Sequence, residues 1–90
     1  PVLILSHNAY NQSHPDCLVM AITSRIDPKD PYGVIFYDSD VEGHLPRESQ
    51  LRADKIYSLH KRILLKCFGS LSLEKQKAAV AVLRGLVETK

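Results

Sequence analysis

Two residues of opposite charge, Arg52 and Asp54, lie two positions apart where polar and apolar residues alternate. Leu51 and Ala53 are the apolar members of this alternation, which is typical of a β-strand with one face in solvent. Arg52 and Asp54 therefore share the solvent face. A substrate lying across the strand would meet a carboxylate that can act as general base beside a cation that can stabilise developing charge. The alternative is an ordinary exposed ion pair, which contributes little to stability.

A second polar group, Thr23, Ser24 and Arg25, ends the most apolar run of the chain. That run, residues 17–22, predicts a strand that is buried on both faces. A buried strand that ends in polar residues carries them to the rim of the core, and the prolines that follow prevent it from continuing. Two hydroxyl groups and a guanidinium can hold a phosphate group there. The alternative is that these residues simply begin a turn.

The sequence gives no pattern for metal or cofactor chemistry. The four histidines lack the spacing of a zinc site, and we expect neither a metal nor another cofactor. A catalytic role for one histidine stays open, although His60, beside Lys61 and Arg62, fits a basic surface turn better. Serine nucleophile elbows, phosphate-binding glycine loops and dinucleotide fingerprints are absent from the sequence. The histidines are His7, His14, His44 and His60.

Length and composition indicate one small globular domain over residues 1–90, with 44% apolar residues. Chains of this size often gain stability from a partner subunit, which suggests a homodimer. The formal net charge of +2 permits a nucleic-acid partner without requiring one. We expect a cytoplasmic protein outside the membrane, because no apolar run approaches ~18 residues and no signal segment opens the chain. Cys17 and Cys67 lie in apolar runs and are predicted to be reduced core residues.

Short strands make up most of the chain, and a helix closes it. Apolar runs predict the strands, and an apolar repeat of three and four positions predicts the helix. The strands are 2–5, 17–25, 32–37, 50–59 and 63–68, the helix is 73–89 with a cap in 70–72, and 6–15 is a loop with one helical turn. The helix face expected to pack on the core or on a second subunit comprises Ala79, Val80, Leu83, Leu86 and Val87. We therefore predict a mainly β fold, a small and strongly bent sheet or barrel with one C-terminal α-helix.

Taken in order, these segments resemble the toxins of bacterial toxin–antitoxin systems known as MazF, PemK and Kid. The resemblance spans nearly the whole chain and depends on five motifs in the right order rather than on any one of them. The motifs are Pro1-Val2-Leu3-Ile4-Leu5-Ser6 with Asn8-Ala9-Tyr10-Asn11, Ala21-Ile22-Thr23-Ser24, Gly43-His44-Leu45-Pro46-Arg47-Glu48-Ser49, Leu51-Arg52-Ala53-Asp54-Lys55-Ile56-Tyr57-Ser58-Leu59 and Gly69-Ser70-Leu71-Ser72.

The resemblance implies a small SH3-like β-barrel with a C-terminal helix, similar to MazF and CcdB, that forms a homodimer. It also implies a toxin that cleaves single-stranded messenger RNA at short sequences without a metal, and that a cognate antitoxin protein neutralises. DNA would then be contacted only indirectly, through the antitoxin complex. Cleavage without a metal uses the ribose 2′-hydroxyl as nucleophile and leaves a 2′,3′-cyclic phosphate and a 5′-hydroxyl, so that the substrate must be RNA.

The resemblance also assigns roles to the two polar groups. The Kid and PemK branch carries arginine-x-aspartate where Arg52 and Asp54 stand, with the aspartate as base and the arginine as acid or charge stabiliser. Because arginine is a poor proton donor, stabilisation of the phosphate is the role expected for Arg52. Hydroxyls of that branch stand at the positions of Thr23 and Ser24 and bind the scissile phosphate, and Thr23 completes the predicted catalytic set. The further RNA-binding candidates are Ser24, Arg25, Glu48 and Gln50.

Family members usually carry an arginine directly before the position of Pro1, and in many of them it is catalytic. We therefore expect a further N-terminal strand and loop that carry such an arginine. An alternative function for the same fold is a toxin that binds and poisons a protein such as DNA gyrase, as the CcdB toxins do. Those toxins act through the end of the C-terminal helix, and residues 87–90 lack an aromatic anchor for a protein partner. A third alternative is a non-catalytic interaction module.

Overall fold

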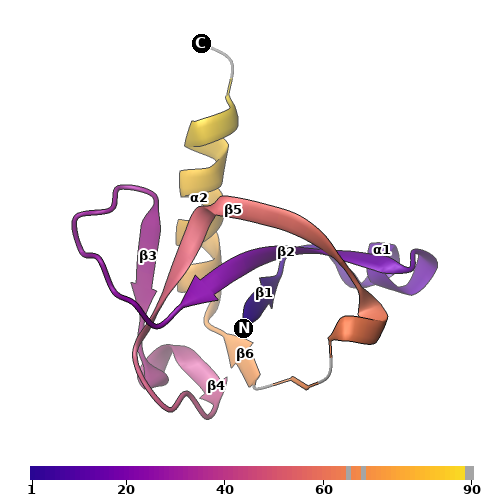
Figure 1. The fold of residues 1–90 in the computed structure, drawn as a ribbon, viewed down its shortest axis with the longest axis horizontal. Helices are drawn as coiled ribbons and strands as arrows, with labels where there is room; N and C mark the ends of the chain where they lie inside the picture. Colours follow the sequence, from indigo (N-terminus) through magenta and orange to yellow (C-terminus); the bar gives the residue numbers. More distant parts are fainter. Residues whose placement is uncertain (65, 68, 89–90) are drawn as a thin grey trace.

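The computed structural model describes residues 1–64, 66–67 and 69–88. The elements in chain order are β1 (Val2–Ile4), α1 (Asn8–Ser13), β2 (Asp16–Thr23), β3 (Gly33–Phe36), the 3-10 helix η1 (Asp38–Asp40), β4 (Val41–Gly43), β5 (Ser49–His60), the 3-10 helix η2 (Lys61–Ile63), β6 (Gly69–Leu71) and α2 (Leu73–Val87). Figure 1 shows a curled sheet with α2 standing against it. The mainly β fold with one long C-terminal helix confirms the prediction from the sequence.

Four antiparallel strands form the main sheet in the order β1-β2-β5-β3, and β4 pairs with β6 in a smaller sheet. The central strand is β5, which pairs with β2 along most of its length and with β3 near its beginning. This register places Arg52 between Ala21 of β2 and Gly33 of β3. The long strands curl so strongly that the sheet forms a half-barrel (Figure 1), as the sequence predicted.

Strand β5 bends sharply near its middle, where it crosses α2 in the view of Figure 1. A bulge against β2 accounts for the bend, because Arg52 pairs with Ala21 whereas Ile56 pairs with Met20. Residues 53–55 lie between these two pairs. Extra residues in one strand increase its twist and change the direction of its side chains, and such bulges are common beside active sites. The bulge includes the predicted catalytic base.

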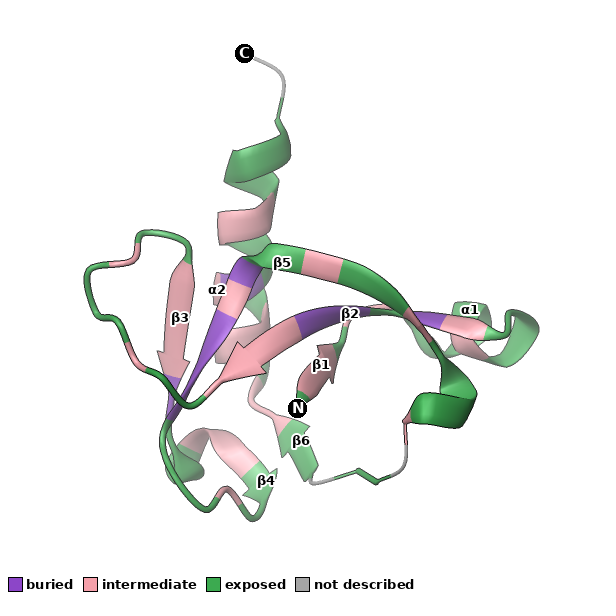
Figure 2. Cartoon of the chain, in the orientation of Figure 1, coloured by how far each residue is buried: buried purple, intermediate pink, exposed green. Residues whose placement is uncertain are grey.

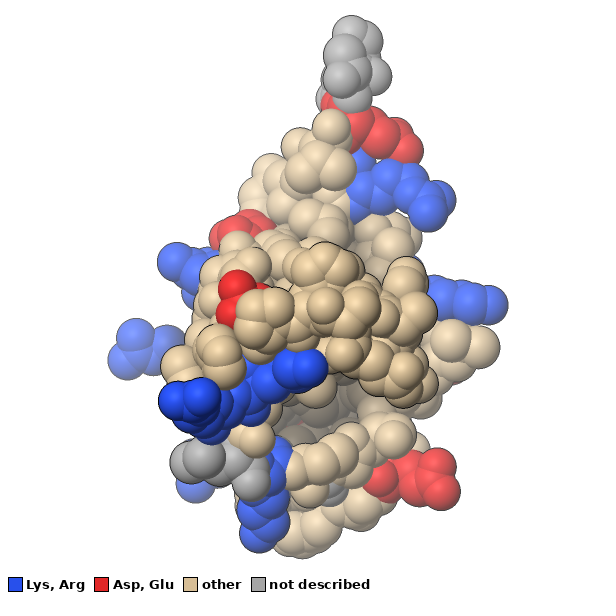
Figure 3. Space-filling model, turned by 90° about the vertical axis from the view of Figure 1, so that its right-hand side faces the viewer, with Lys and Arg blue, Asp and Glu red and all other residues tan. Residues whose placement is uncertain are grey.

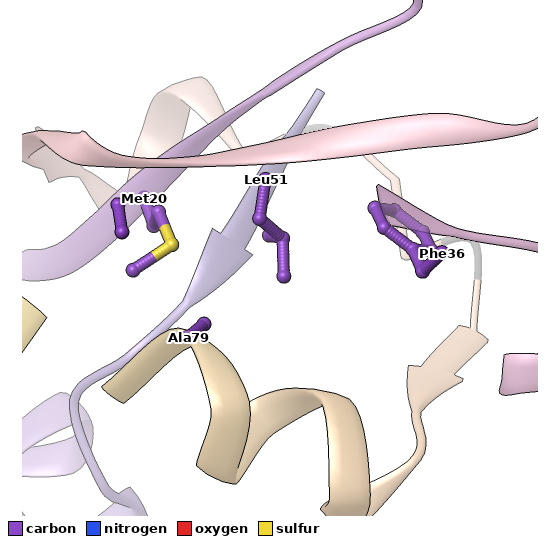
Figure 4. Close-up of a cluster of buried hydrophobic side chains, with 5 residues drawn as sticks. Met20, Phe36, Leu51 and Ala79 are labelled. Carbon is purple, nitrogen blue, oxygen red and sulfur yellow. The ribbon is translucent and has the colours of Figure 1, made fainter. Parts of the chain in front are cut away.

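The hydrophobic core lies between the sheet and α2. In Figure 4 the side chains of Met20, Phe36, Leu51 and Ala79 converge from β2, β3, β5 and α2. Leu51 and Ala53 are fully buried, which confirms the period of two predicted for this strand. Figure 2 shows buried positions in the first half of β5 and along part of β2. The core therefore fixes the strand that carries the candidate site.

Helix α2 begins where the sequence predicted. The Ser72 side chain accepts a hydrogen bond from the Lys75 backbone N–H at 3.3 Å, which caps the helix. Ala79 is buried and Leu83 is half-buried, so part of the predicted apolar face packs on the core. The rest of that face is exposed: Val80, Leu86 and Val87. The helix ends at Val87, and the predicted end, residue 89, lies outside the described residues.

Two predictions for the segment before α2 are wrong. Residues 63–68 do not form the predicted strand in their described part, because η2 ends at Ile63 and β6 begins only at Gly69. An apolar run becomes a strand only where a neighbouring strand offers hydrogen-bond partners, and this segment instead links β5 to the small sheet. Cys67 is therefore exposed rather than in the core, whereas Cys17 is buried as predicted. Residues 65 and 68 lie outside the described residues.

Strand β2 is less buried than the sequence predicted. Val19 and Met20 are fully buried, but the side chain between Cys17 and Val19, Leu18, is 41% exposed. An antiparallel sheet can leave one face in solvent even where the sequence is continuously apolar. Within the described residues, no helix is long and apolar enough to cross a membrane.

Candidate active site

Arg52 and Asp54 form a direct ion pair on the outer face of β5. The Arg52 guanidinium donates two hydrogen bonds to the Asp54 carboxylate, from Nε to Oδ1 at 3.2 Å and from Nη2 to Oδ2 at 3.1 Å. Each side chain is 33% exposed, so that a ligand can reach both partners. The alternation that buries Leu51 and Ala53 is what brings the two charged groups to solvent.

The ion pair changes the proton affinity of both groups. The hydrogen bond from Arg52 lowers the pKa of the Asp54 carboxyl below its ordinary value of 3.8, and the nearby charges of Arg52 and Lys55 add to this effect. The same hydrogen bond raises the pKa of the Arg52 guanidinium. At neutral pH Asp54 is therefore ionised and able to accept a proton. An anion that draws Arg52 away would make Asp54 a stronger base, because its main hydrogen-bond donor would be gone.

A third charged side chain, Asp30, lies beside the pair. Arg52 Nε is 3.9 Å from Asp30 Oδ2, so the guanidinium lies between two carboxylates. Asp30 Oδ1 also accepts a hydrogen bond from the Tyr32 backbone N–H at 2.9 Å, which fixes the turn before β3. Sequence reasoning missed Asp30. The sequence carries no local signal for this contact, because the pairing of Gly33 with Arg52 arises only in the folded sheet.

Thr23 ends β2 close to the ion pair. It lies opposite Gln50, two positions before Arg52 on β5, so that Thr23 and Arg52 are diagonal neighbours on one face, roughly 7–8 Å apart. Thr23 Oγ1 accepts a hydrogen bond from the Arg25 backbone N–H at 3.1 Å. That contact uses a lone pair of the hydroxyl and leaves its proton available to a ligand. The structure therefore brings Thr23, Arg52 and Asp54 to one surface.

The other predicted RNA-binding residues lie at different distances from this surface. Ser24 and Arg25 are exposed in the loop that follows Thr23. Glu48 is exposed just before β5 begins, four residues from Arg52, which corresponds to roughly 13 Å along a strand. The structure therefore places Ser24 and Arg25 beside the site and Glu48 at some distance from it.

Gln50 is not positioned for direct contact with a ligand, which corrects its interpretation as an RNA-binding residue. Its side chain is on the outer side of β5, as the period of two predicts, but it is only 1% exposed. Gln50 Oε1 accepts a hydrogen bond from the Asp27 backbone N–H at 2.8 Å. Gly33 lies against the same side chain, since a Cβ there would be 1.9 Å from Gln50 Nε2. The loop before β3 thus covers Gln50, and Gln50 holds that loop.

Three of the four histidines, His7, His14 and His60, make local structural contacts. His7 Nδ1 accepts the Tyr10 N–H at 3.2 Å at the start of α1, and His60 Nδ1 accepts a backbone N–H at 3.0 Å at the start of η2. His14 stacks on Tyr10 with ring centroids 4.1 Å apart. Within the part of the chain that the structure describes, no three His, Cys, Asp or Glu side chains are grouped so that they could hold a metal ion.

A basic face lies away from the ion pair, on the side of α1 and η2. Lys61 and Arg62 are exposed in η2, as expected for a basic turn. Figure 3 views the molecule from this side and shows Lys and Arg side chains gathered on it. The Lys61 Nζ donates to the Asn11 backbone carbonyl at 2.6 Å, which ties η2 to α1.

Comparisons with known proteins agree with the resemblance predicted from the sequence. The family model described as "PemK-like, MazF-like toxin of type II toxin-antitoxin system" matches residues 1–87. The solved Mycobacterium tuberculosis toxin MazF-mt6 is 20% identical, with a TM-score of 0.79, and the match covers 94% of this chain and 82% of that chain. It therefore shares the fold. Among curated protein sequences, none matches the chain.

Two further solved structures are similar to the chain. An endoribonuclease from a mycobacterial species is 26% identical, with a TM-score of 0.79, and the match covers 94% of this chain and 76% of that chain. A mycobacterial endoribonuclease in complex with its cognate antitoxin is 29% identical, with a TM-score of 0.73. The match covers 99% of this chain and 84% of that chain. These similarities confirm the predicted fold.

Proposed function

The chain belongs to the PemK-like, MazF-like toxins of type II toxin–antitoxin systems, and from that membership we propose that it cleaves single-stranded messenger RNA without a metal or other cofactor. The observation that carries the proposal is the solvent-accessible Arg52–Asp54 pair beside Thr23. These groups offer a base, a cation and a hydroxyl donor on one surface. Two similar solved structures, both of endoribonucleases, support the same activity.

Binding of RNA begins with an exchange of partners at Arg52. The scissile phosphate offers the guanidinium a further anion that can accept two parallel hydrogen bonds. The Thr23 hydroxyl, whose proton is available, donates to the same phosphate. Asp54 is released as the phosphate replaces it as the acceptor of the Arg52 hydrogen bonds, and its proton affinity rises at the moment when a base is needed.

Cleavage then follows from the positions of these groups. Asp54 accepts the proton of the ribose 2′-hydroxyl, the 2′-oxygen attacks the adjacent phosphorus, and the bond from phosphorus to the 5′-oxygen breaks. The products are a 2′,3′-cyclic phosphate and a 5′-hydroxyl. Solvent water can protonate the leaving oxygen, since Arg52 is too weak an acid and instead stabilises the charge on the phosphorane. General base catalysis by Asp54 contributes about 10²- to 10⁴-fold to the rate.

The remaining predicted residues act on RNA beyond the scissile bond. Ser24 and Arg25 bind a neighbouring phosphate through a hydroxyl and a guanidinium. Glu48 can only accept hydrogen bonds, so its contact with RNA is to amino groups of bases rather than to phosphate. Gln50 acts indirectly, because its buried side chain holds the loop that carries Asp30.

The proposed partners are a second copy of the chain and a cognate antitoxin, with DNA reached only through the antitoxin complex and the cytoplasm as the site of action. Apolar side chains exposed on α2 support a protein partner, since Leu73 is 63% and Val87 is 70% exposed. Sedimentation equilibrium of the purified toxin should give the mass of two chains. A monomer at all concentrations would contradict the homodimer.

The nuclease proposal is tested by incubating full-length protein with a long single-stranded RNA in EDTA. We expect cuts at defined sites from the wild type and from Asp38→Asn, and a loss of about 10²- to 10⁴-fold in rate from Asp54→Asn. Asp38 is a matched control because its exposed carboxylate accepts a hydrogen bond from a loop N–H, that of Leu45. Intact RNA with the wild type, together with growth arrest in cells, would contradict the proposal and favour a toxin that poisons a protein target.

A further inference from the structure

We propose that Asp30 is a positioning residue of this site, which holds the Arg52 guanidinium in place when the scissile phosphate separates Arg52 from Asp54. The inference rests on the proposed nuclease function. In this role Asp30 does not contact the reacting atoms. It keeps the Arg52 guanidinium in position while the phosphate replaces Asp54 as its hydrogen-bond acceptor.

The geometry at Arg52 Nε carries the first step. This nitrogen donates to Asp54 Oδ1 at 3.2 Å and lies 3.9 Å from Asp30 Oδ2. When Asp54 turns to the ribose hydroxyl, the Nε proton needs another acceptor, and Asp30 is the second carboxylate that pairs with Arg52 among the described residues. With Nε held by Asp30, the terminal nitrogens of the guanidinium are available for the phosphate.

Asp30 is the more fixed of the two carboxylates. Its side chain is 19% exposed, against 33% for Asp54. Its Oδ1 accepts the Tyr32 N–H at 2.9 Å, and its backbone carbonyl accepts the Gly33 N–H at 3.2 Å. Asp30 therefore remains in position while the ion pair opens.

The turn that carries Asp30 is attached at both ends to β5, the strand that carries Arg52. At its beginning, the Asp27 N–H donates to the buried Gln50 side chain at 2.8 Å. At its end, the Ala53 N–H donates to the Tyr32 carbonyl at 3.0 Å. The separation of Asp30 and Arg52 is consequently set by the fold rather than by a flexible loop, which is the condition for a positioning residue.

The charges predict a specific kinetic effect when Asp30 is neutralised. With one carboxylate removed, Arg52 is paired with Asp54 alone, and Asp54 becomes harder to release. The site also loses a negative charge that repels the substrate phosphate. Asp30→Asn should therefore lower kcat by about 10- to 100-fold, while KM stays the same or falls. A merely structural role would not give this combination, because a disturbed fold weakens binding as well.

The test compares Asp30→Asn with Asp38→Asn in full-length protein, using single-turnover and steady-state cleavage of one RNA. Both substitutions keep an oxygen for the backbone N–H that the carboxylate accepts and remove one negative charge. We expect the loss in kcat only in Asp30→Asn, and thermal unfolding checks that both variants are folded. A loss in both variants, a rise in KM with unchanged kcat, or a kcat within about twofold of wild type for Asp30→Asn would each overturn the inference.

A second measurement separates this inference from the nuclease proposal. NMR titration of the Asp54 carboxylate in the free protein requires no substrate, and it should show protonation at lower pH in Asp30→Asn, since Arg52 is then shared with no other carboxylate. If the wild type does not cleave RNA, the nuclease proposal fails. The titration still tests whether Asp30 and Asp54 are coupled through Arg52. An unchanged Asp54 titration would overturn the role of Asp30 whatever the activity.

Discussion

The Arg52–Asp54 pair is closed in the free protein, and its closure explains how an aspartate with a lowered pKa can serve as a base. Both Asp54 oxygens accept hydrogen bonds from Arg52. Those bonds keep Asp54 ionised but weaken it as a proton acceptor. A phosphate that competes for Arg52 removes this effect only when substrate is bound. The proposed base is thus ionised at neutral pH and would become strongest in the complex with substrate.

Substitution of Arg52 by alanine should raise the pKa of Asp54 toward 3.8, because the Arg52 hydrogen bond is the largest cause of its lowering. In the wild type the pKa is lower in the folded than in the unfolded state. The stabilisation from the pair is therefore present above the unfolded pKa and is lost as pH falls through the folded value. Carboxylate NMR measures the shift, and Arg84→Ala on the exposed side of α2 is the control. An equal titration in Arg52→Ala and wild type would contradict the prediction.

Thr23 is predicted to act through its hydroxyl rather than its shape. Thr23→Val keeps the branched side chain and removes the donor to a charged phosphate, which should lower kcat/KM by about 10- to 100-fold. Thr23→Ser keeps the hydroxyl and should stay within about threefold of wild type. Cleavage rates of both variants, with melting temperatures as a check on folding, test this. Equal losses in the two variants would show that the methyl group matters instead.

At the residue scale, the local alternation of polar and apolar residues predicted part of the candidate site. Arg52 and Asp54 could be placed on one exposed face because a period of two depends only on neighbours in sequence. The same period placed Gln50 on that face, yet a loop 17 to 23 residues away covers it. Asp30 was missed for a related reason, since its contact with Arg52 joins two segments that only the fold brings together.

Among the elements, the contact between β3 and β5 determines where the loop before β3 lies. Gly33 pairs with Arg52 and lies directly over the buried Gln50 side chain. The absence of a Cβ there allows the loop to approach β5 closely enough for the Gln50–Asp27 hydrogen bond. A small residue at this point is therefore required by packing, independently of its backbone conformation.

Gly33→Ala should destabilise the protein by about 1–3 kcal/mol, because the new Cβ would lie 1.9 Å from Gln50 Nε2 and would displace a buried polar side chain. Gly85→Ala is the matched control. A Cβ at Gly85 meets no atom within 4 Å, and alanine within a helix should stabilise it by about 0.5–1 kcal/mol. Urea unfolding measures both changes. Destabilisation of equal size in the two variants would contradict this account of Gly33.

The elements with a strong pattern of apolar residues could be predicted. Those that exist only because another strand pairs with them could not. Strands β2, β3 and β5 and helix α2 follow apolar patterns that a strand or helix must have to bury one face. The short β4 is not among the predicted strands, and it exists because β6 pairs with it. Residues 63–68 show the opposite case, an apolar run that is not a strand in its described part.

For the whole molecule, a net charge of +2 limits how RNA can be bound. In the proposed complex, the arginines beside the site, Arg25 and Arg52, would give about two phosphate contacts per protomer. Single-stranded nucleic acid binding should then depend weakly on salt, with a slope of log K against log salt of about −1.4 per protomer. Fluorescence anisotropy with a short RNA measures the slope, and Arg25→Ala should reduce its magnitude by about 0.7. A slope of about −3 or steeper would indicate that the basic face near η2 also binds RNA.

The fold of the whole molecule was predicted because its motifs occur in the same order as in the toxins it resembles, and the family model and solved structures agree. Composition alone indicated only a small domain, since net charge and length do not encode topology. Neither the sequence motifs nor the composition identifies the proposed partners. Surfaces that pair with another chain carry the same exposed apolar residues whatever the partner is.

The central claim is that the ribose 2′-hydroxyl, deprotonated by Asp54, is the nucleophile. The most direct test uses an RNA with one 2′-deoxy nucleotide at a mapped cleavage site, incubated with full-length protein in EDTA, with the fragment ends read by mass spectrometry. We predict that this bond stays intact, while an all-ribose RNA is cut there to a 2′,3′-cyclic phosphate and a 5′-hydroxyl. Cleavage at the deoxy position, or a linear phosphate formed directly, would contradict the account.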